Sequence, residues 1–352
     1  MIQGSISAEQ AYRNKKISIA KAGLLLAWLS SVTCICQTMF NNIGTPIISA
    51  NFEDRALITA IIAITLLGMS DFFSGIYTLI YNVATKRSIK EYRRMCGMKI
   101  SWTMLLAALA AGPFATGCWM SSSNMCGVTY TTAILALTPA VTAIMGHFVF
   151  KEKLGARVVF GIAIVIIGTI INGWAKPEGM DYFYIGVLLA ALAPIGFSLE
   201  GMISTYASDM VDPLVACGFF RCFGAGILGL VGMAILSAAT GYSSVYTGVI
   251  STVFSNPIAF FSLAMMGLFG AIGYGTTYAA FNKCGPTRTL AIVYTMPVWS
   301  VPIGLAFAAA TPLYTYSVTP LALVGVVIII VGMVLVVAKP SELFSLRNFG
   351  DD

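Results

Sequence analysis

The stretch Cys126–Gly146 reads CGVTYTTAILALTPAVTAIMG, and it returns at Cys284–Gly304 as CGPTRTLAIVYTMPVWSVPIG. The two copies lie 158 residues apart without a gap and are identical at eight of 21 positions. The same register aligns Gly112 with Gly270. A self-match at a fixed spacing is the signature of a duplicated structural unit. We therefore expect the fold to contain two related halves.

The composition places both halves in lipid. The chain has 352 residues, of which 58% are hydrophobic and 10% charged, and its mean hydropathy is +0.87. A soluble domain carries about 25% charged residues. The net charge of +6 is spread over short loops, so no nucleic-acid partner is expected. The eight cysteines include no CxxC pair, and neither a metal nor a cofactor is expected.

Ten apolar segments are each close to the roughly 20 residues that a helix needs to cross about 30 Å of hydrocarbon. Backbone polar groups must be satisfied within lipid, which favours helices. The sequence thus predicts an all-α integral membrane protein. Prolines at 139, 194, 297 and 302 fall inside segments and predict kinks. The predicted spans are 20–43, 57–82, 100–121, 127–149, 155–174, 182–206, 213–238, 257–281, 287–309 and 319–338.

The loops orient the chain through their basic residues, which favour the cytoplasmic side. With a cytoplasmic N-terminus, 17 of the 20 Lys and Arg residues fall inside, whereas Arg55 and Lys176 fall outside and Arg221 lies within a span. This bias predicts a multi-pass protein of the cytoplasmic (inner or plasma) membrane with both termini in the cytoplasm.

The repeated stretch is the fourth span of residues 1–176 and the ninth of residues 177–352. Each half holds five spans, and an odd number makes the second copy enter the membrane upside down. The sequence thus predicts two inverted five-helix repeats, as in many transporters. GIAIVIIG at Gly161 matches GVVIIIVG at Gly325 with the offset grown to 164, so the second copy has six extra residues. They fall around Thr311–Pro320, which we expect to be an external loop.

Polar residues form a stripe along the first span, and a related stripe lies in the sixth. LLAWL at Leu25 matches LLAAL at Leu188, an offset of 163 residues, and in this register Gln37 corresponds to Glu200. A polar stripe in lipid must face protein or water, so one interpretation is a substrate cavity lined by both halves. The other is hydrogen bonding between helices, worth about 0.6 kcal/mol per contact. The stripes are Ser30, Thr33, Gln37 and Asn41, and Gly196, Glu200 and Ser204.

Three charged residues lie inside predicted spans: Asp71, Glu200 and Arg221. A charge at the bilayer centre costs about 2.5–3.5 kcal/mol on insertion scales, so each needs a partner or water. One hypothesis is that an Asp71–Arg221 ion pair locks the inner gate, with Glu200 free to meet substrate or a proton. The alternative is a static buried salt bridge.

Aromatic residues are dense near the repeat. Tyr274 and Tyr278 are neighbours on one helix face, and Trp119, Tyr294 and Trp299 lie on adjoining spans. Aromatic faces with a carboxylate suit a cationic amine, including a quaternary ammonium group. The pattern is equally compatible with an aromatic-tolerant amino-acid site, and Trp and Tyr also gather at membrane interfaces.

The run Gly146–Gly173 reads GHFVFKEKLGARVVFGIAIVIIGTIING and resembles the end of an EamA-type repeat, which has a proline-bearing span, a loop Glu and a closing Gly-x6-Gly span. With two such halves, the chain resembles the drug/metabolite transporter superfamily over nearly its full length. The second half lacks the loop Glu. The resemblance implies a central cavity between the halves, with the last span of each at the periphery. The places of the pattern are filled by Pro139, Glu152, Gly161 and Gly168.

The leading functional interpretation is a secondary transporter, not an enzyme. It would move a small organic metabolite of the amino-acid or amine class by alternating access, with export or exchange as its mode. The alternative is proton-coupled or facilitated uptake of a quaternary amine such as choline through an aromatic cage. A distant alternative is an intramembrane enzyme, because GFSLEG at Gly196 resembles a nucleophile motif whose second glycine is replaced by Glu200.

Partners follow from this interpretation. We expect a small-molecule substrate, membrane lipids and, as an open option, proton coupling through Glu200 or Asp71. The small residues Gly161, Gly168, Gly325 and Gly332 give the fifth and tenth spans smooth faces. These faces predict peripheral packing or a homodimer through the two spans.

Overall fold

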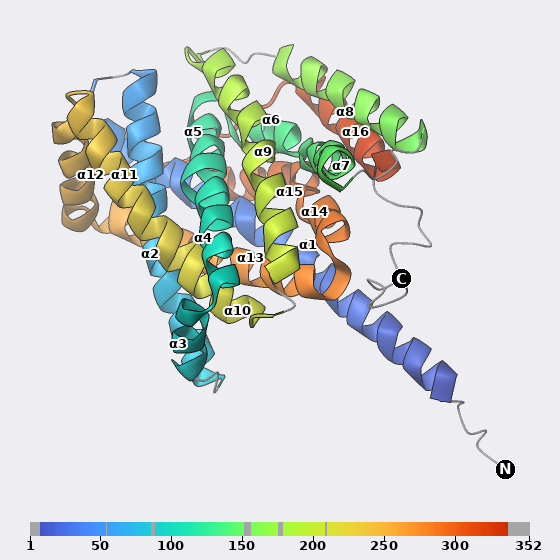
Figure 1. Ribbon diagram of the computed structural model, residues 1–352. Coiled ribbons are helices and arrows are strands. Elements are labelled where there is room, and N and C mark those ends of the chain that lie inside the picture. The colour runs from blue at the N-terminus through green and yellow to red at the C-terminus, as the bar shows by residue number, and fades with distance from the viewer. Residues whose placement is uncertain are drawn as a thin grey trace.

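The computed structural model describes residues 8–53, 55–85, 89–150, 156–174, 179–207 and 210–336. Regular secondary structure in these ranges is entirely helical (Figure 1), which confirms the all-α prediction. Glu152 of the EamA-type pattern lies outside the described residues.

The helices follow the apolar segments, with short polar connections between them. Two segments, η1 and η2, are wider π-helical stretches inside longer helices. The elements are α1 (Ala8–Ser49), α2 (Ala56–Ala84), α3 (Ile89–Gly97), α4 (Lys99–Leu109), η1 (Ala110–Thr116), α5 (Gly117–Cys126), α6 (Val128–Leu135), α7 (Thr138–Phe150), α8 (Ala156–Trp174), α9 (Phe183–Ala207), α10 (Pro213–Ala216), η2 (Cys217–Gly224), α11 (Ala225–Ala239), α12 (Ser243–Ser255), α13 (Pro257–Cys284), α14 (Pro286–Val293), α15 (Met296–Ala310) and α16 (Pro320–Val336).

Within the described residues, eight helical stretches are long and apolar enough to cross a membrane. The fifth and tenth predicted spans correspond to shorter apolar stretches, Val159–Ile171 and Pro320–Leu335. The protein is thus a multi-pass membrane protein, and the count of ten spans stays a prediction.

The repeated stretch folds alike in both copies. Gly127 and Gly285 have φ of 87° and 77°, a backbone conformation that glycine adopts without steric cost. Each glycine precedes an eight-residue helix, α6 or α14, which then breaks before a second helix begins. These spans are therefore pairs of short helices and not single continuous ones.

The breaks change the expected role of two prolines. Pro139 and Pro297 lie in the first turn of α7 and α15, where a missing N–H removes no hydrogen bond. The interruption predicted at each proline is present, but it is a complete break of the helix just before the proline and not a bend in a continuous one. Pro194 and Pro302 do lie inside α9 and α15.

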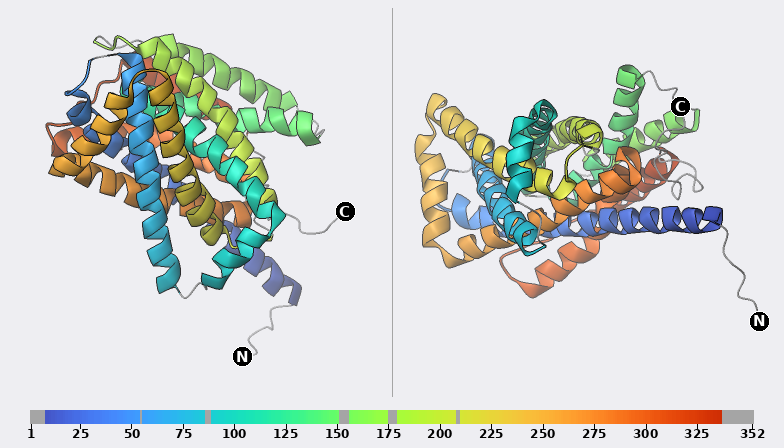
Figure 2. Two further views of the ribbon diagram at one scale, coloured as in Figure 1. Left: turned by 60° about the vertical axis from the view of Figure 1, so that its left-hand side comes forward. Right: turned by 60° about the horizontal axis from the view of Figure 1, so that its bottom comes forward.

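Helix α8 packs along α16 at one edge of the molecule, and α2, α11 and α12 lie at the other (Figures 1 and 2). The contact between α8 and α16 is close because a Cβ on Gly168 would lie 2.9 Å from the backbone nitrogen of Ile329. A Cβ on Gly332 would lie 2.7 Å from that of Val165. The glycine faces of α8 and α16 therefore pack against each other within one chain. A homodimer through these two helices would have to use their outward faces.

Helix α12 was not among the predicted elements. It buries Val245, Val249 and Val253, spaced at one helical turn, in a cluster that also contains residues of α2 and α13. Its polar remainder lowers the hydropathy of the segment below that of a membrane span, so the sequence reads as a loop.

Exposed Cys96 on α3 allows a direct test of the predicted orientation. A membrane-impermeant maleimide should label Cys96 only after cells are permeabilised, because α3 is predicted to be cytoplasmic. A Ser244→Cys variant, at the exposed start of α12, should be labelled in intact cells. Labelling of Cys96 in intact cells would show that the orientation is reversed.

Candidate functional site

Three charged side chains meet inside the helix bundle. Arg221 of η2 is 1% exposed; its Nη1 lies 3.0 Å from Asp71 Oδ2 of α2, and its Nε lies 3.3 Å from Glu200 Oε1 of α9. The Asp71–Arg221 ion pair expected from the sequence is present. The expectation that Glu200 is free is wrong, because Arg221 bonds to both carboxylates. With all three groups ionised, the cluster has a formal charge of −1.

Two further contacts fix the guanidinium. Arg221 Nη2 donates to Thr116 Oγ1 at 2.8 Å, and Arg221 Cζ lies 3.9 Å from the centroid of the Tyr274 ring. Gly112 makes room for the cluster, since a Cβ there would lie 2.7 Å from Ala225 Cβ and 3.2 Å from Arg221 Nη1. Alanine at position 112 would press on both neighbours.

A small cavity of about 30 Å³ adjoins the charged cluster. The carboxylate in its described lining is Glu200, whose Oε1 accepts a hydrogen bond from the Tyr278 hydroxyl at 2.9 Å. Such a volume holds a water molecule but not an organic substrate, so substrate entry requires the helices to move apart. The lining residues are Cys34, Trp119, Phe197, Glu200, Arg221, Tyr274, Thr277, Tyr278, Phe281, Leu290, Val293, Tyr294 and Met296.

Trp119 lies against this cavity with its ring edge-on to Phe197, at 6.1 Å between centroids. It is 2% exposed, and its Nε1 is a buried donor without a hydrogen-bond partner in the described part of the chain. Trp119 is therefore not a membrane-interface anchor. Its indole N–H is available to a polar group that enters the cavity.

The structure brings together five of the predicted substrate-binding residues and separates the other three. Gln37 lies behind the cavity and donates from Nε2 to the Tyr274 hydroxyl at 2.9 Å. Asn41 lies one turn further along α1 and donates to Asn42 Oδ1. Trp299 packs edge-on against Trp28, at 5.5 Å between centroids, and does not line this cavity.

Sequence reasoning missed Phe197 and Phe281. Each lies three residues from a residue that was predicted, Phe197 from Glu200 and Phe281 from Tyr278. Residues at that spacing share a helix face. Helical periodicity around the predicted residues could therefore have found both.

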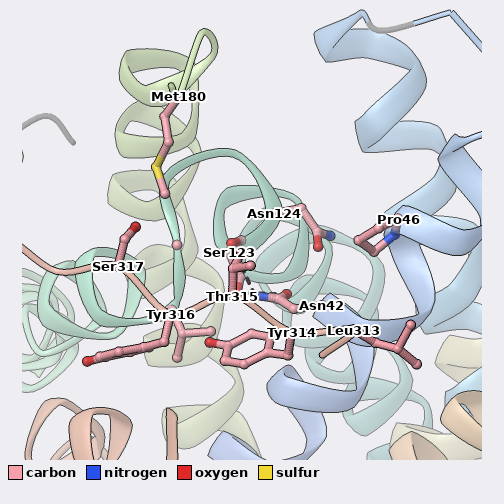
Figure 3. Close-up of a pocket in the computed structure, with 12 residues that line it drawn as sticks. Asn42, Pro46, Ser123, Asn124, Met180, Leu313, Tyr314, Thr315, Tyr316 and Ser317 are labelled. Carbon is pink, nitrogen blue, oxygen red and sulfur yellow. Dashed lines mark hydrogen bonds between the residues drawn. The ribbon is translucent and has the colours of Figure 1, made fainter. Parts of the chain in front are cut away.

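A second, polar pocket of about 180 Å³ lies where α1, α5 and the α15–α16 connection meet (Figure 3). Tyr314 and Tyr316 of this connection line it, together with Asn42, Ser123 and Asn124. The connection includes the six extra residues of the second copy. The topology deduced from the basic residues puts this pocket on the outer side.

The α15–α16 connection is anchored by Tyr316. The Tyr316 hydroxyl lies 2.8 Å from Thr129 Oγ1, and its ring fills the space where a Cβ on Gly304 would be. Burial raises the pKa of Tyr316. Tyr316 thus holds the α15–α16 connection in place through the packing of its ring on Gly304 and the hydrogen bond of its hydroxyl with Thr129.

Asn42 and Ser123, which both line the second pocket, are bonded to each other. Asn42 Nδ2 donates to the Ser123 carbonyl at 3.3 Å, and Ser123 Oγ donates to Asn42 Oδ1 at 3.1 Å. Ser123 follows Trp119 by one helical turn, about 6 Å along the axis. Ser123 thus lines the second pocket one turn away from Trp119, which lines the central cavity.

Comparison with known proteins finds a family match over part of the chain. Residues 43–174 match the EamA-like transporter family. This match confirms the family resemblance drawn from the sequence. It includes Asp71, Thr116 and Trp119, whereas Glu200 and Arg221 lie in the second half, beyond the matched residues.

Two individual proteins extend the similarity. Protein LicB of Haemophilus influenzae (strain ATCC 51907 / DSM 11121 / KW20 / Rd) is 23% identical over 246 residues, which cover 69% of this chain and 77% of LicB. A solved crystal structure of a protein aligns with 90% of this chain and 95% of its own, with a TM-score of 0.54 and 14% identity. At that identity the second similarity supports the fold alone. The EamA-like match points to a transporter and not to an enzyme.

Proposed function

We propose that this protein is a secondary transporter that moves a small organic cation of the amine class by alternating access. The observation that carries the proposal is the formal charge of −1 on the buried cluster of Asp71, Glu200 and Arg221, which adjoins an aromatic-walled cavity. Glu200 faces this cavity, and its partner Arg221 is shared with Asp71.

Electrostatics favours a cation at this position. A buried carboxylate without full compensation is costly in a medium of low polarity. A substrate ammonium group would bring the formal charge of the cluster from −1 to zero. The faces of Tyr274, Tyr278, Tyr294 and Trp119 would add attraction to a cation, which is strongest where water is excluded.

An amine fits this site better than an amino acid does. The carboxylate of an amino acid would need a cationic or strong hydrogen-bond partner. Arg221 already bonds to Asp71, Glu200 and Thr116. The remaining donor, Trp119 Nε1, is neutral and suits a hydroxyl group.

The inverted repeat is part of the proposal, with residues 1–176 and 177–352 as its units. Helix α1 packs on α13, and α9 packs on η1 and α5, which are equivalent pairs when the first half is exchanged with the second. Thr116 and Tyr274 are equivalent in the 158-residue register, and both contact Arg221. The charged cluster thus lies where the two units meet, which is where transporters with inverted repeats bind substrate.

Alternating access would then open one side of the cluster at a time. The Asn42–Ser123 contact and the connection anchored by Tyr316 would form the outer barrier. The cavity of about 30 Å³ represents an occluded form, which must widen to accept substrate.

A thermal-shift panel on the purified protein tests the substrate class. Tetramethylammonium, choline and ethanolamine should stabilise the protein, with about 2.7 kcal/mol at a hundredfold excess over Kd. The neutral carbon isostere of choline, in which carbon replaces the quaternary nitrogen, is the matched control and should have no effect. Equal stabilisation by the isostere, or none by any amine, would contradict the proposal.

A further inference from the structure

We infer that Arg221 is a built-in competitor of the substrate, a tethered cation that occupies Glu200 and the Tyr274 face until an organic cation displaces it. The inference rests on the proposed function and adds the regulation of its site. It assigns to the ion cluster a role that neither a fixed salt bridge nor a simple gate would have.

The competition follows from the contacts. The guanidinium takes up two features that an ammonium group would use, namely the Glu200 carboxylate at 3.3 Å and the Tyr274 ring at 3.9 Å. Both residues line the small cavity. The face of Tyr274 that lies 3.9 Å from the guanidinium has no room for a second cation, and two cations beside one carboxylate repel each other. Binding of substrate at this face therefore requires Arg221 to move away.

Asp71 provides the place to which Arg221 retreats. Its Oδ2 is bonded to Arg221 Nη1 at 3.0 Å, a shorter contact than that to Glu200, and Asp71 does not line the cavity. Its other oxygen, Oδ1, is buried and accepts no hydrogen bond from the described residues. A shift of Arg221 away from Glu200 would allow a bidentate contact between its guanidinium and the Asp71 carboxylate, the preferred geometry for this pair of groups.

The arrangement compensates Glu200 in both states of the carrier. When no substrate is bound, Arg221 neutralises Glu200. When substrate is bound, Arg221 pairs with Asp71 alone and the substrate cation neutralises Glu200. Without Arg221 the cluster would have a formal charge of −2 when no substrate is bound, so the empty carrier would reorient slowly. The loaded carrier would still reorient, because the substrate cation compensates Glu200. Arg221 is thus expected to control affinity and the return of the empty carrier.

Three variants separate competition from simple charge. In Asp71→Asn, Arg221 loses its alternative carboxylate partner and stays paired with Glu200, so tetramethylammonium should bind about tenfold more weakly. In the double variant Asp71→Asn/Arg221→Gln, the formal charge equals that of the wild type but the tethered cation is gone. This variant should bind tetramethylammonium about tenfold more tightly than the wild type. In Arg221→Gln alone, binding should also tighten.

Calorimetry with tetramethylammonium on the purified full-length proteins gives the binding order. Wild-type-like or weaker binding by the folded double variant would overturn the inference, because charge alone predicts equality. If the Arg221 variants fail to fold, Asp71→Asn alone still tests the inference. Unchanged or tighter binding of tetramethylammonium by Asp71→Asn would contradict the role of Asp71 as the alternative partner of Arg221. Absence of binding to the wild type would instead reject the proposed function, and with it this inference.

Flux measurements in proteoliposomes provide a readout that a purely structural role would not move. The double variant should retain exchange of internal choline for labelled external choline. Its net uptake into choline-free vesicles should fall about tenfold or more, because Glu200 lacks a cation during return. Parallel loss or parallel retention of exchange and net uptake would overturn the role of Arg221 in the return step.

Discussion

Replacement of Glu200 by glutamine is expected to abolish binding and transport of organic cations while the protein remains folded. Glutamine keeps the shape of the side chain and can still accept the hydrogen bond from the Tyr278 hydroxyl. It removes the one carboxylate that faces the aromatic cavity, and it leaves Arg221 paired with Asp71 alone. Truncating one partner of a buried charge pair costs about 2–5 kcal/mol of binding.

The measurement for Glu200→Gln is the calorimetric Kd for tetramethylammonium, with the melting temperature as a check on folding. Glu53→Gln is the matched control, because Glu53 is a surface carboxylate paired with Arg55 at 2.7 Å, and exposed pairs contribute little. Unchanged affinity of Glu200→Gln would remove Glu200 from the site and would leave the substrate class without its main support.

The Gly332→Leu substitution is expected to destabilise the fold more than any other single change considered, through the contact between α8 and α16. A Cβ at Gly332 already falls 2.7 Å from the backbone nitrogen of Val165, which belongs to a helix and cannot yield locally. The two helices must therefore separate. Overpacking of this kind costs about 1–3 kcal/mol, and a longer side chain pushes the value to the upper end.

The melting temperature of Gly332→Leu in detergent, compared with that of Gly232→Leu, gives this effect. Gly232 on α11 is a suitable control because no atom lies within 4 Å of the Cβ that would be added there. The control should melt like the wild type. Equal melting temperatures of the two variants would mean that α8 and α16 are not packed through their glycine faces.

Much of the fold was predictable because membrane spans are dictated by length and hydropathy. The charged pair Asp71–Arg221 was also predictable, since two opposite charges inside lipid-facing segments have few other ways to be compensated. The repeat register pointed to Gln37 and Glu200 as equivalent positions, and both now lie around the tyrosines of α13.

Other features depend on three-dimensional packing that periodicity does not encode. Arg221 can contact both carboxylates only because α2, α9 and η2 are positioned with Asp71, Glu200 and Arg221 at the same level along the helix axes. No local sequence pattern gives that relative position. Trp299 and Tyr294 are both aromatic residues of the repeat, yet Trp299 packs on Trp28 and Tyr294 lines the cavity. The interruptions after Leu135 and Val293 were predicted only as proline kinks and not as full helix breaks, because the apolar composition continues through them.

The most direct test of the account is uptake of labelled choline into proteoliposomes that contain either the wild type or Glu200→Gln. Uptake by the wild type should be saturable, and excess tetramethylammonium should suppress it whereas the neutral carbon isostere of choline should not. Vesicles with Glu200→Gln should match protein-free vesicles. Uptake by Glu200→Gln at the wild-type rate, or suppression by the neutral isostere, would contradict a transporter that recognises organic cations through this carboxylate.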